Sequence, residues 1–384
     1  MRKAGAHLDE VYALLDYEPV KGQGVYLEDA AGRRVLDLYG GHAVAVLGHG
    51  HPRLVNAITR QAEQLLFQTN AVRLKIRDAA AERLASFAPA SLERVFFVNS
   101  GAEANENALR IALRATGRDK VVAIEHGFHG RSAAAASVTW GSEKSWYGFP
   151  RRPMDVSFVP RDDIAALKAA IDADTAAVIL EPVQGLAGAY DLSSAFMQAA
   201  RSATTAVGAL LILDEVQTGI GRLGEPFGAQ LFDVEPDLLT TAKGLAGGLP
   251  AGAVLMRNEL ARELGPGALG TTFGGGPVIA AAILAVLETI EEENLLARVR
   301  EVSAEIRSRC GIGPVQAFQG AGLLLGLKTA RPAAAVRDAL LERDILTGTS
   351  ADPNILRLLP PLILTSEHVA RLAEALGDLE NAPL

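Results

Sequence analysis

Ala209-Leu-Leu-Ile-Leu-Asp-Glu-Val-Gln217 is an apolar run that leads directly into a pair of acids. A second run, Asp237-Leu-Leu-Thr-Thr-Ala-Lys-Gly244, leads to a lone amine in a glycine-rich loop. Short, almost fully apolar runs bounded by turn residues are typical of strands buried on both faces of a parallel sheet. We therefore expect Asp214 and Lys243 to lie at the ends of successive buried strands.

Other short apolar runs repeat this pattern, with helical stretches between most of them. They lie at 94–98, 120–124, 177–180, 209–213, 238–240 and 253–256. Strands that alternate with helices indicate an α/β fold, a mostly parallel sheet covered by helices. We assign this large domain to residues 51–277.

The two ends of the chain predict a smaller α+β domain. Residues 1–50 form an N-terminal arm that belongs to it, and residues 278–384 form its C-terminal part. No linker separates the parts, so we expect one packed body. The expected elements are a hairpin at 24–37, helices at 54–67, 77–87 and 278–294, strands at 322–328 and 354–359, and helices that start at Pro332 and Ser366.

The bulk composition is that of a soluble globular enzyme. The 384 residues carry a net charge of −8, which argues against nucleic acid or an anionic membrane surface as the main partner. The single cysteine, Cys310, leaves no internal disulfide, so we expect a cytoplasmic protein. No signal peptide is evident, and no apolar stretch is long enough to cross a bilayer.

Asp214 and Lys243 together indicate a pyridoxal phosphate site. This cofactor needs a lysine for its Schiff base and an acid that keeps its pyridine nitrogen protonated. A buried carboxylate needs such a cation, because burial without one is unfavourable. The alternatives are a helix cap for Asp214 and a surface position for Lys243. The small apolar neighbours of Lys243 argue against the latter.

The turn Asn99-Ser-Gly-Ala-Glu-Ala-Asn-Glu106 follows one predicted strand and opens a helix. Free backbone N–H groups and the positive end of a helix dipole make such a start a phosphate site. Ser100, Gly101 and Ala102 are the candidates. An ordinary N-cap by Asn99 or Ser100 explains the same residues equally well.

Glu125-His-Gly-Phe-His-Gly-Arg131 follows the next strand along the chain. Its glycines allow Phe128 to stack on a flat ring, and Arg131 can form a bidentate ion pair with a substrate carboxylate. His126 and His129 invite a zinc interpretation, with His42, His49 and His51 as further candidates. Their spacing matches no standard site, and we expect no metal.

Two further motifs need an interpretation. Gly219-Ile-Gly-Arg-Leu-Gly224 matches the dinucleotide pattern G-x-G-x-x-G, but Glu225-Pro226 blocks the helix that must follow, so we expect a loop. Arg357 lies in an apolar run and needs an anionic partner, either Glu181 or a substrate carboxylate. A static structural ion pair between Glu181 and Arg357 is the alternative.

Taken together, these motifs resemble a class III aminotransferase of fold type I, in the acetylornithine/ornithine aminotransferase family. The resemblance covers nearly the whole chain, and several independent motifs occur in the right order. They lie at 36–52, 100–105, 128–131, 213–222, 242–244 and 270–275.

The resemblance implies how the cofactor is held. Lys243 bonds to it and later moves a proton, and Asp214 pairs with its pyridine nitrogen. By the same resemblance, Gly101 and Ala102 bind the phosphate and Phe128 stacks on the ring. Val216 lies under the ring, and Gln217 contacts the phenolic oxygen. Thr272 reaches the phosphate from the other subunit, which implies a homodimer with shared active sites.

The resemblance also implies how substrates are chosen. Thr271 and Arg131 are similar to residues of the acyl-ornithine or 2-oxoglutarate site. Glu181 with Arg357 resembles the pair that switches between an amino donor with a remote amine and a dicarboxylate acceptor. The chain departs from the usual family residues at four positions, which put the substrate rather than the chemistry in doubt: Gly276, Leu223, His42 and Ala45.

The resemblance implies transfer of the terminal amine of N2-acetylornithine to 2-oxoglutarate, a step of arginine biosynthesis. Alternative donors are succinylornithine, succinyl-diaminopimelate, carrier-linked lysine, ornithine and 4-aminobutyrate. An acyl group changes binding by only a few kcal/mol, so the sequence leaves them open. A pyridoxal phosphate aminomutase is another alternative, although Arg357 favours a transaminase with a dicarboxylate acceptor. A further alternative, a non-catalytic nucleotide-binding protein, is supported only by the G-x-G-x-x-G match at 219–224.

Overall fold

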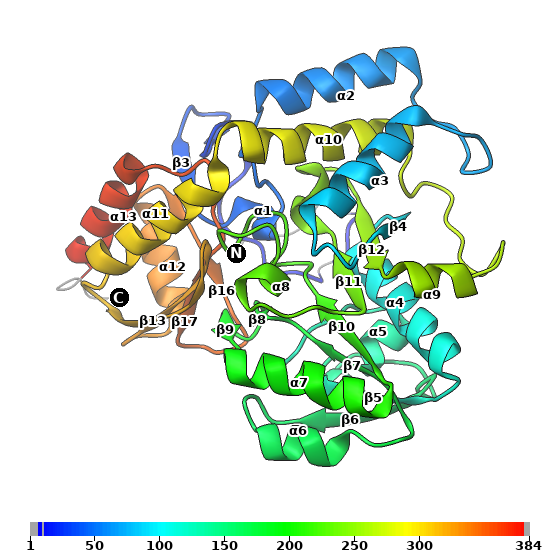
Figure 1. The fold of residues 1–384 in the computed structure, drawn as a ribbon. Coiled ribbons are helices and arrows are strands. Elements are labelled where there is room, and N and C mark those ends of the chain that lie inside the picture. Colours follow the sequence, from blue (N-terminus) through cyan, green and yellow to red (C-terminus); the bar gives the residue numbers. More distant parts are fainter. Residues whose placement is uncertain (1–6, 10, 380–384) are drawn as a thin grey trace.

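A seven-stranded sheet forms the centre of the molecule (Figure 1). The computed structural model describes residues 7–9 and 11–379. Only β12 runs antiparallel to its neighbours β4 and β11, so the predicted mostly parallel sheet is confirmed. In spatial order the strands are β4 (Arg94–Val98), β12 (Gly252–Met256), β11 (Leu238–Thr241), β10 (Leu210–Asp214), β7 (Thr175–Leu180), β5 (Lys120–Ile124) and β6 (Asp155–Val159).

Alternating side chains explain why this sheet is buried on both faces. In β10, Leu211 and Leu213 belong to one hydrophobic core, whereas Ile212 belongs to the other. The first core also takes in α7 (Ser194–Val207), beside which α6 (Ile164–Ala170) packs. The second core takes in α4 (Gly101–Thr116), which packs against α5 (Ala133–Ser137).

A helical layer completes the large domain. The apolar helix α10 (Pro277–Glu292) packs against α2 (Pro52–Gln64) and α3 (Lys75–Phe87) (Figure 1). The predicted helix at 54–67 ends earlier, because Leu65 adopts an extended conformation. Short elements fill the remaining connections: η1 (Ser142–Lys144), β8 (Val183–Gln184), β9 (Tyr190–Asp191), α8 (Gly228–Leu231), η2 (Lys243–Ala246) and α9 (Asn258–Glu263).

The two ends of the chain meet in a shared sheet. The predicted hairpin is present as β2 (Tyr26–Asp29) and β3 (Arg34–Asp37), flanked by β1 (Pro19–Gln23). Strand β15 (Ile345–Leu346) pairs in parallel with β3. Between this sheet and the large domain lies a short turn, α1 (Gly40–Ala43), that contacts η2.

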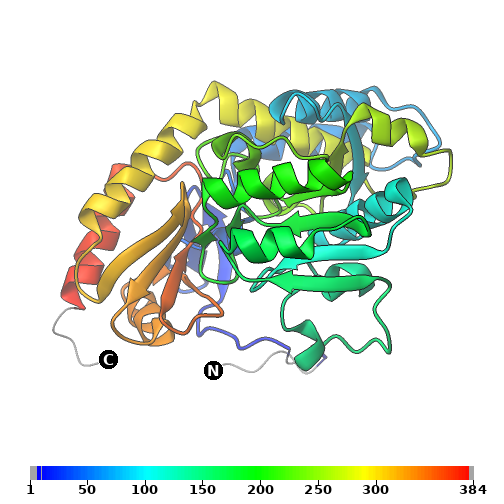
Figure 2. The same cartoon turned by 60° about the horizontal axis from the view of Figure 1, so that its bottom comes forward.

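A separate antiparallel sheet follows α10, in the order β13 (Val315–Ala321), β14 (Leu324–Thr329), β17 (Ile355–Leu358) and β16 (Gly348–Thr349). The single strand predicted at 322–328 is wrong at its start, because Gly322, with φ of 52°, turns the chain between β13 and β14. Figure 2 shows this unit beside the large sheet with its helices, α11 (Leu295–Arg309), α12 (Ala333–Glu342) and α13 (Ser366–Asp378).

Across the described part of the chain, no helix combines the length and apolar character that a membrane span requires.

Candidate active site

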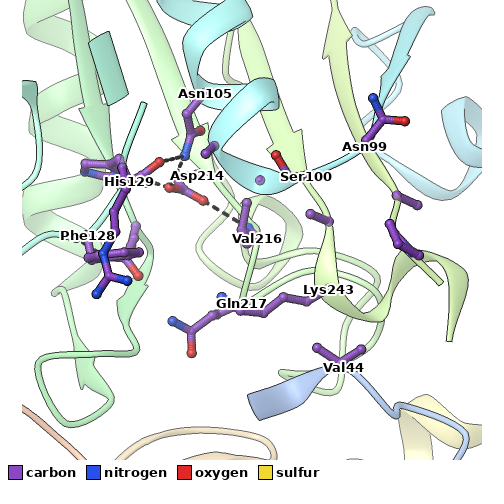
Figure 3. Close-up of a pocket in the computed structure, with 18 of the residues that line it drawn as sticks. Val44, Asn99, Ser100, Asn105, Phe128, His129, Asp214, Val216, Gln217 and Lys243 are labelled. Carbon is purple, nitrogen blue, oxygen red and sulfur yellow. Dashed lines mark hydrogen bonds and ion pairs between the residues drawn. The ribbon is translucent and has the colours of Figure 1, made fainter. Parts of the chain in front are cut away.

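A cavity of about 470 Å³ opens at the carboxyl ends of the parallel strands (Figure 3). Ligands bind there in open α/β sheets, because the loops that leave the strands converge. Ten of the residues predicted from the sequence line the cavity: Ser100, Gly101, Ala102, Phe128, Arg131, Glu181, Asp214, Val216, Gln217 and Lys243.

The carboxylate of Asp214 is held by three donors. Its Oδ2 atom accepts from Asn105 Nδ2 at 2.7 Å and lies 2.7 Å from His129 Nδ1, while its Oδ1 accepts from the Val216 N–H at 3.0 Å. Thr240 in turn donates to Asn105 Oδ1 at 2.6 Å. This network fixes the carboxylate in one orientation at the wall of the cavity.

Lys243 extends into the same cavity from the loop after β11 (Figure 3). Burial lowers the pKa of its amine to about 8, although the carboxylates of Asp214 and Glu181 oppose that shift. Its φ is 40°, a left-handed conformation that is rare outside glycine and recurs at functional sites. The amine therefore becomes neutral, and so nucleophilic, at a lower pH than that of an ordinary lysine, in a cavity that it shares with the acid on the neighbouring strand.

The start of α4 has the N-cap that the sequence offered, and its geometry is compatible with the phosphate site as well. Ser100 is the N-cap, since its side chain accepts from the Glu103 N–H at 3.1 Å. This leaves the N–H groups of Gly101 and Ala102 without an acceptor in the described chain. Gly101 also lies tight against Val216, where an added Cβ would come within 2.8 Å of the valine side chain. The cavity thus presents free amides at a helix N-terminus, which suits a phosphate.

Phe128 and Arg131 add an aromatic ring and a cation to the lining of the cavity. The Phe128 N–H donates to Glu181 Oε1 at 2.9 Å, which fixes the loop that carries the phenyl ring. The Arg131 guanidinium lies 5.9 Å from the centre of that ring and 5.3 Å from the centre of the Trp146 ring. It forms no salt bridge within the described chain, so it remains available to an anion.

The ion pair expected between Glu181 and Arg357 is absent from the described structure. Glu181 instead accepts from the N–H groups of Phe128 and Gly185, and burial next to Asp214 raises its pKa to about 7. Arg357 donates to the carbonyls of Thr349 and Gly185 and to the Tyr39 hydroxyl. The static-pair alternative is therefore wrong for this conformation.

Thr271 and Thr272 do not line the cavity of their own chain. Thr271 lies next to it, where its hydroxyl accepts from Asn99 Nδ2 at 3.3 Å. Thr272 is exposed. Its predicted role toward a partner subunit stays a prediction.

Four of the histidines considered as metal ligands have other hydrogen-bond partners. They pair as His42 with Tyr39, His49 with Asp37, His51 with Glu293 and His129 with Asp214. The 219–224 segment is a buried loop of turns, without the helix start that a dinucleotide site requires. Asn105 was missed from the sequence, and His129 was considered there only as a metal ligand.

Comparison with known proteins decides the family. The family model of class III aminotransferases matches residues 9–379. The chain belongs to this family. It is thus a transaminase that depends on pyridoxal phosphate, and its fold matches this assignment.

Relatives of this aminotransferase cover almost its full length. It is 45% identical over 369 residues to "Acetylornithine aminotransferase" of Streptomyces coelicolor, covering 94% of this chain and 91% of that protein. It is 39% identical over 384 residues to "Acetylornithine aminotransferase 1" of Bordetella bronchiseptica, covering 97% of each.

Solved structures agree with the fold of the aminotransferase. The ornithine aminotransferase of Toxoplasma gondii has a TM-score of 0.91 at 28% identity, covers 98% of this chain and 92% of its own, and has partial occupancy of pyridoxal phosphate at its active site. The acetylornithine aminotransferase of Elizabethkingia anophelis has a TM-score of 0.85 at 28% identity, covering 97% and 96%.

The residues of the cavity fit the cofactor of this family. Free amides at Gly101 and Ala102 suit its phosphate, the fixed carboxylate of Asp214 suits a protonated ring nitrogen, and Lys243 suits its aldehyde. The buried Gln217 Oε1 has no partner in the described chain, which leaves the side-chain amide free to meet a polar group on the ring.

Proposed function

We propose that this aminotransferase moves the terminal amine of N2-acetylornithine to 2-oxoglutarate, giving N-acetylglutamate semialdehyde and glutamate in arginine biosynthesis. The observation that carries the proposal is the near-full-length match to proteins named acetylornithine aminotransferase, at 38–45% identity. An unpaired Arg131 at the cavity supports it, because this donor carries a carboxylate far from the reacting amine.

Each catalytic role is assigned to a side chain or backbone amide at the cavity. Lys243 holds the cofactor and carries a proton at Nζ between the substrate carbon and the cofactor. Asp214 keeps the ring nitrogen protonated, and Gly101 with Ala102 binds the phosphate. When bound, pyridoxal phosphate acts as an electron sink that lets an amino group leave one carbon and join another.

The remaining predicted residues orient the ring and the substrates. When the cofactor is bound, Phe128 and Val216 would pack against its ring, and Gln217 would contact its phenolic oxygen. Arg131 and Thr271 contact a substrate carboxylate. Glu181 and Arg357 distinguish the two substrates, since a remote amine suits the acid and a second carboxylate suits the arginine.

We further propose a cytoplasmic homodimer in which Thr272 contacts the phosphate bound by the partner subunit. An exposed apolar patch beside Thr272 supports the dimer, because contiguous apolar surface of this kind marks interfaces. The patch consists of Leu65, Leu66, Phe67, Val72 and Phe273. Cytoplasmic residence is supported by Cys310, which is buried and unpaired.

A panel of amino donors with 2-oxoglutarate tests the substrate. The protein is loaded with pyridoxal phosphate, and kcat/KM is measured for acetylornithine, succinylornithine, ornithine and 4-aminobutyrate. We expect acetylornithine to give the highest value. A higher value for ornithine or 4-aminobutyrate would contradict the proposal. Failure of 2-oxoglutarate to restore the aldehyde form of the cofactor would exclude it as the acceptor.

A further inference from the structure

Arg357 is a buried cation whose hydrogen-bond partners are all neutral. Its side chain is 2% exposed. Nε donates to Thr349 O at 2.7 Å, Nη1 to Gly185 O at 3.0 Å and Nη2 to the Tyr39 hydroxyl at 3.2 Å. A guanidinium has five N–H groups, so within the described residues one remains free on each terminal nitrogen. A pair of free N–H groups on a buried cation that forms no ion pair within the described residues is suited to a carboxylate.

The Tyr39 hydroxyl is itself fixed by His42, whose Nδ1 lies 2.5 Å away. Burial, together with the nearby charges of Arg357 and Lys243, lowers the pKa of His42 to about 3, so its imidazole is neutral at pH 7. Burial raises the pKa of Tyr39, so the phenol keeps its proton. The hydroxyl therefore donates to His42 and presents its lone pairs to Arg357.

A strained turn puts His42 in this position. Residues Gly40, Gly41, His42 and Ala43 all have positive φ, from 56° to 71°. Each non-glycine residue in this region costs roughly 1–2 kcal/mol. Asp37 stabilises the turn, because its Oδ1 accepts from the N–H groups of Tyr39 and Gly40 and its Oδ2 pairs with His49. Strain that the surroundings hold in place is a mark of functional segments.

We propose that Tyr39 and His42 are positioning residues. They fix the Arg357 guanidinium so that its two free N–H groups can bind a substrate carboxylate, and they keep it from pairing with Glu181. The proposal rests on the proposed function, which requires a dicarboxylate acceptor. Burial lowers the pKa of Arg357, and the charge of Glu181 opposes that shift, so the two groups interact although they form no ion pair. Without the Tyr39 hydroxyl, the guanidinium loses one acceptor and turns toward that acid. A dicarboxylate then has to displace the acid before it binds.

Tyr39→Phe tests the hydroxyl alone. The ring is kept, including its packing against Gly348 and its cation–π contact with Arg357 at 5.8 Å. Calorimetry on the cofactor-loaded protein measures the Kd of glutarate, an unreactive dicarboxylate. We expect the Kd to rise about tenfold, the scale of one hydrogen bond to a charged group. The KM for 2-oxoglutarate rises in parallel, while the KM for the amino donor changes by less than about twofold.

Tyr190→Phe is the matched control. It removes a hydroxyl that bonds to Asp162 at 3.1 Å, outside the cavity, and should leave glutarate binding unchanged. His42 provides a second test with rescue. We expect His42→Gly to weaken glutarate binding as Tyr39→Phe does. His42→Asn should restore it to within about threefold, because asparagine tolerates a left-handed φ and carries an acceptor oxygen.

Three results would overturn the positioning role. These are no glutarate binding by the unmodified protein, an unchanged Kd in Tyr39→Phe, or equal changes in both half-reactions. Failure of the proposed function looks different. If no donor is transaminated but glutarate binding still depends on Tyr39 and His42, the substrate assignment falls and the positioning role stands.

Discussion

His129 Nδ1 lies 2.7 Å from Asp214 Oδ2, and both side chains are buried. A carboxylate only accepts, so this nitrogen carries the proton. Asn105 donates to the same oxygen. The acid at the cavity is therefore held in one orientation by two donors from separate parts of the chain.

Removing either donor should weaken catalysis. We expect His129→Ala and Asn105→Ala each to lower kcat about tenfold, since each loss of a charge-assisted hydrogen bond is worth about 1–3 kcal/mol. His129→Asn, which keeps an N–H near the same place, should lose less. Steady-state kinetics at saturating cofactor measures this. Full activity in both alanine variants would show that Asp214 needs no such support.

The sequence predicted the cavity well because its residues follow buried strands. Carboxyl ends of parallel strands meet at one edge of a sheet, so Asp214, Lys243, Glu181 and Phe128 could be brought together without a structure. The partners of Asp214 could not be found in this way. Asn105 and His129 lie 109 and 85 residues from it, and no local pattern reports a contact over such a separation.

The same limit explains why an ion pair between Arg357 and Glu181 was wrongly expected for this conformation. Its hydroxyl partner, Tyr39, is 318 residues away. An apolar run containing an arginine indicates only that a partner exists. Strand β6 was missed for a local reason: Asp155 and Ser157 interrupt its apolar pattern, as suits the edge of the sheet that it occupies.

The lowered pKa of Lys243 predicts how cofactor uptake depends on pH. Only the neutral amine attacks an aldehyde, and a pKa of about 8 means that this form dominates above pH 8 rather than above the ordinary value of 10.5. The rate at which the cofactor-free protein binds pyridoxal phosphate should rise through pH 8 and then level off. Stopped-flow absorbance measures it. A rate still rising steeply at pH 10 would contradict the shift.

Gly101 should be required for phosphate binding. In Gly101→Ala the new Cβ meets the Val216 side chain at 2.8 Å, so either the valine or the start of α4 has to move. We expect weaker retention of pyridoxal phosphate, by at least about tenfold, with the fold intact, as is typical of a small displacement in a preorganised site. Equilibrium dialysis measures the Kd. Ser193→Ala is the comparison, since it removes the same kind of cap from α7, outside the cavity, at about 1 kcal/mol of stability.

The apolar patch next to Thr272 predicts the oligomeric state. Phe273 is 62% exposed and its ring lies 5.4 Å from that of Phe67. Phe273→Asp should shift the dimer toward monomers and lower the affinity for the cofactor, because a charge buried at an interface is unfavourable. Light scattering gives the mass. Ile312→Asp, at an exposed apolar residue outside the patch, should remain dimeric.

The most direct test of the site is to find which lysine bonds to the cofactor. The protein is incubated with pyridoxal phosphate, reduced with borohydride and digested, and the peptides are analysed by mass spectrometry. We predict the reduced pyridoxyl phosphate group on Lys243, and its loss in Lys243→Met together with activity. A label on another lysine, or full activity in Lys243→Met, would contradict the account.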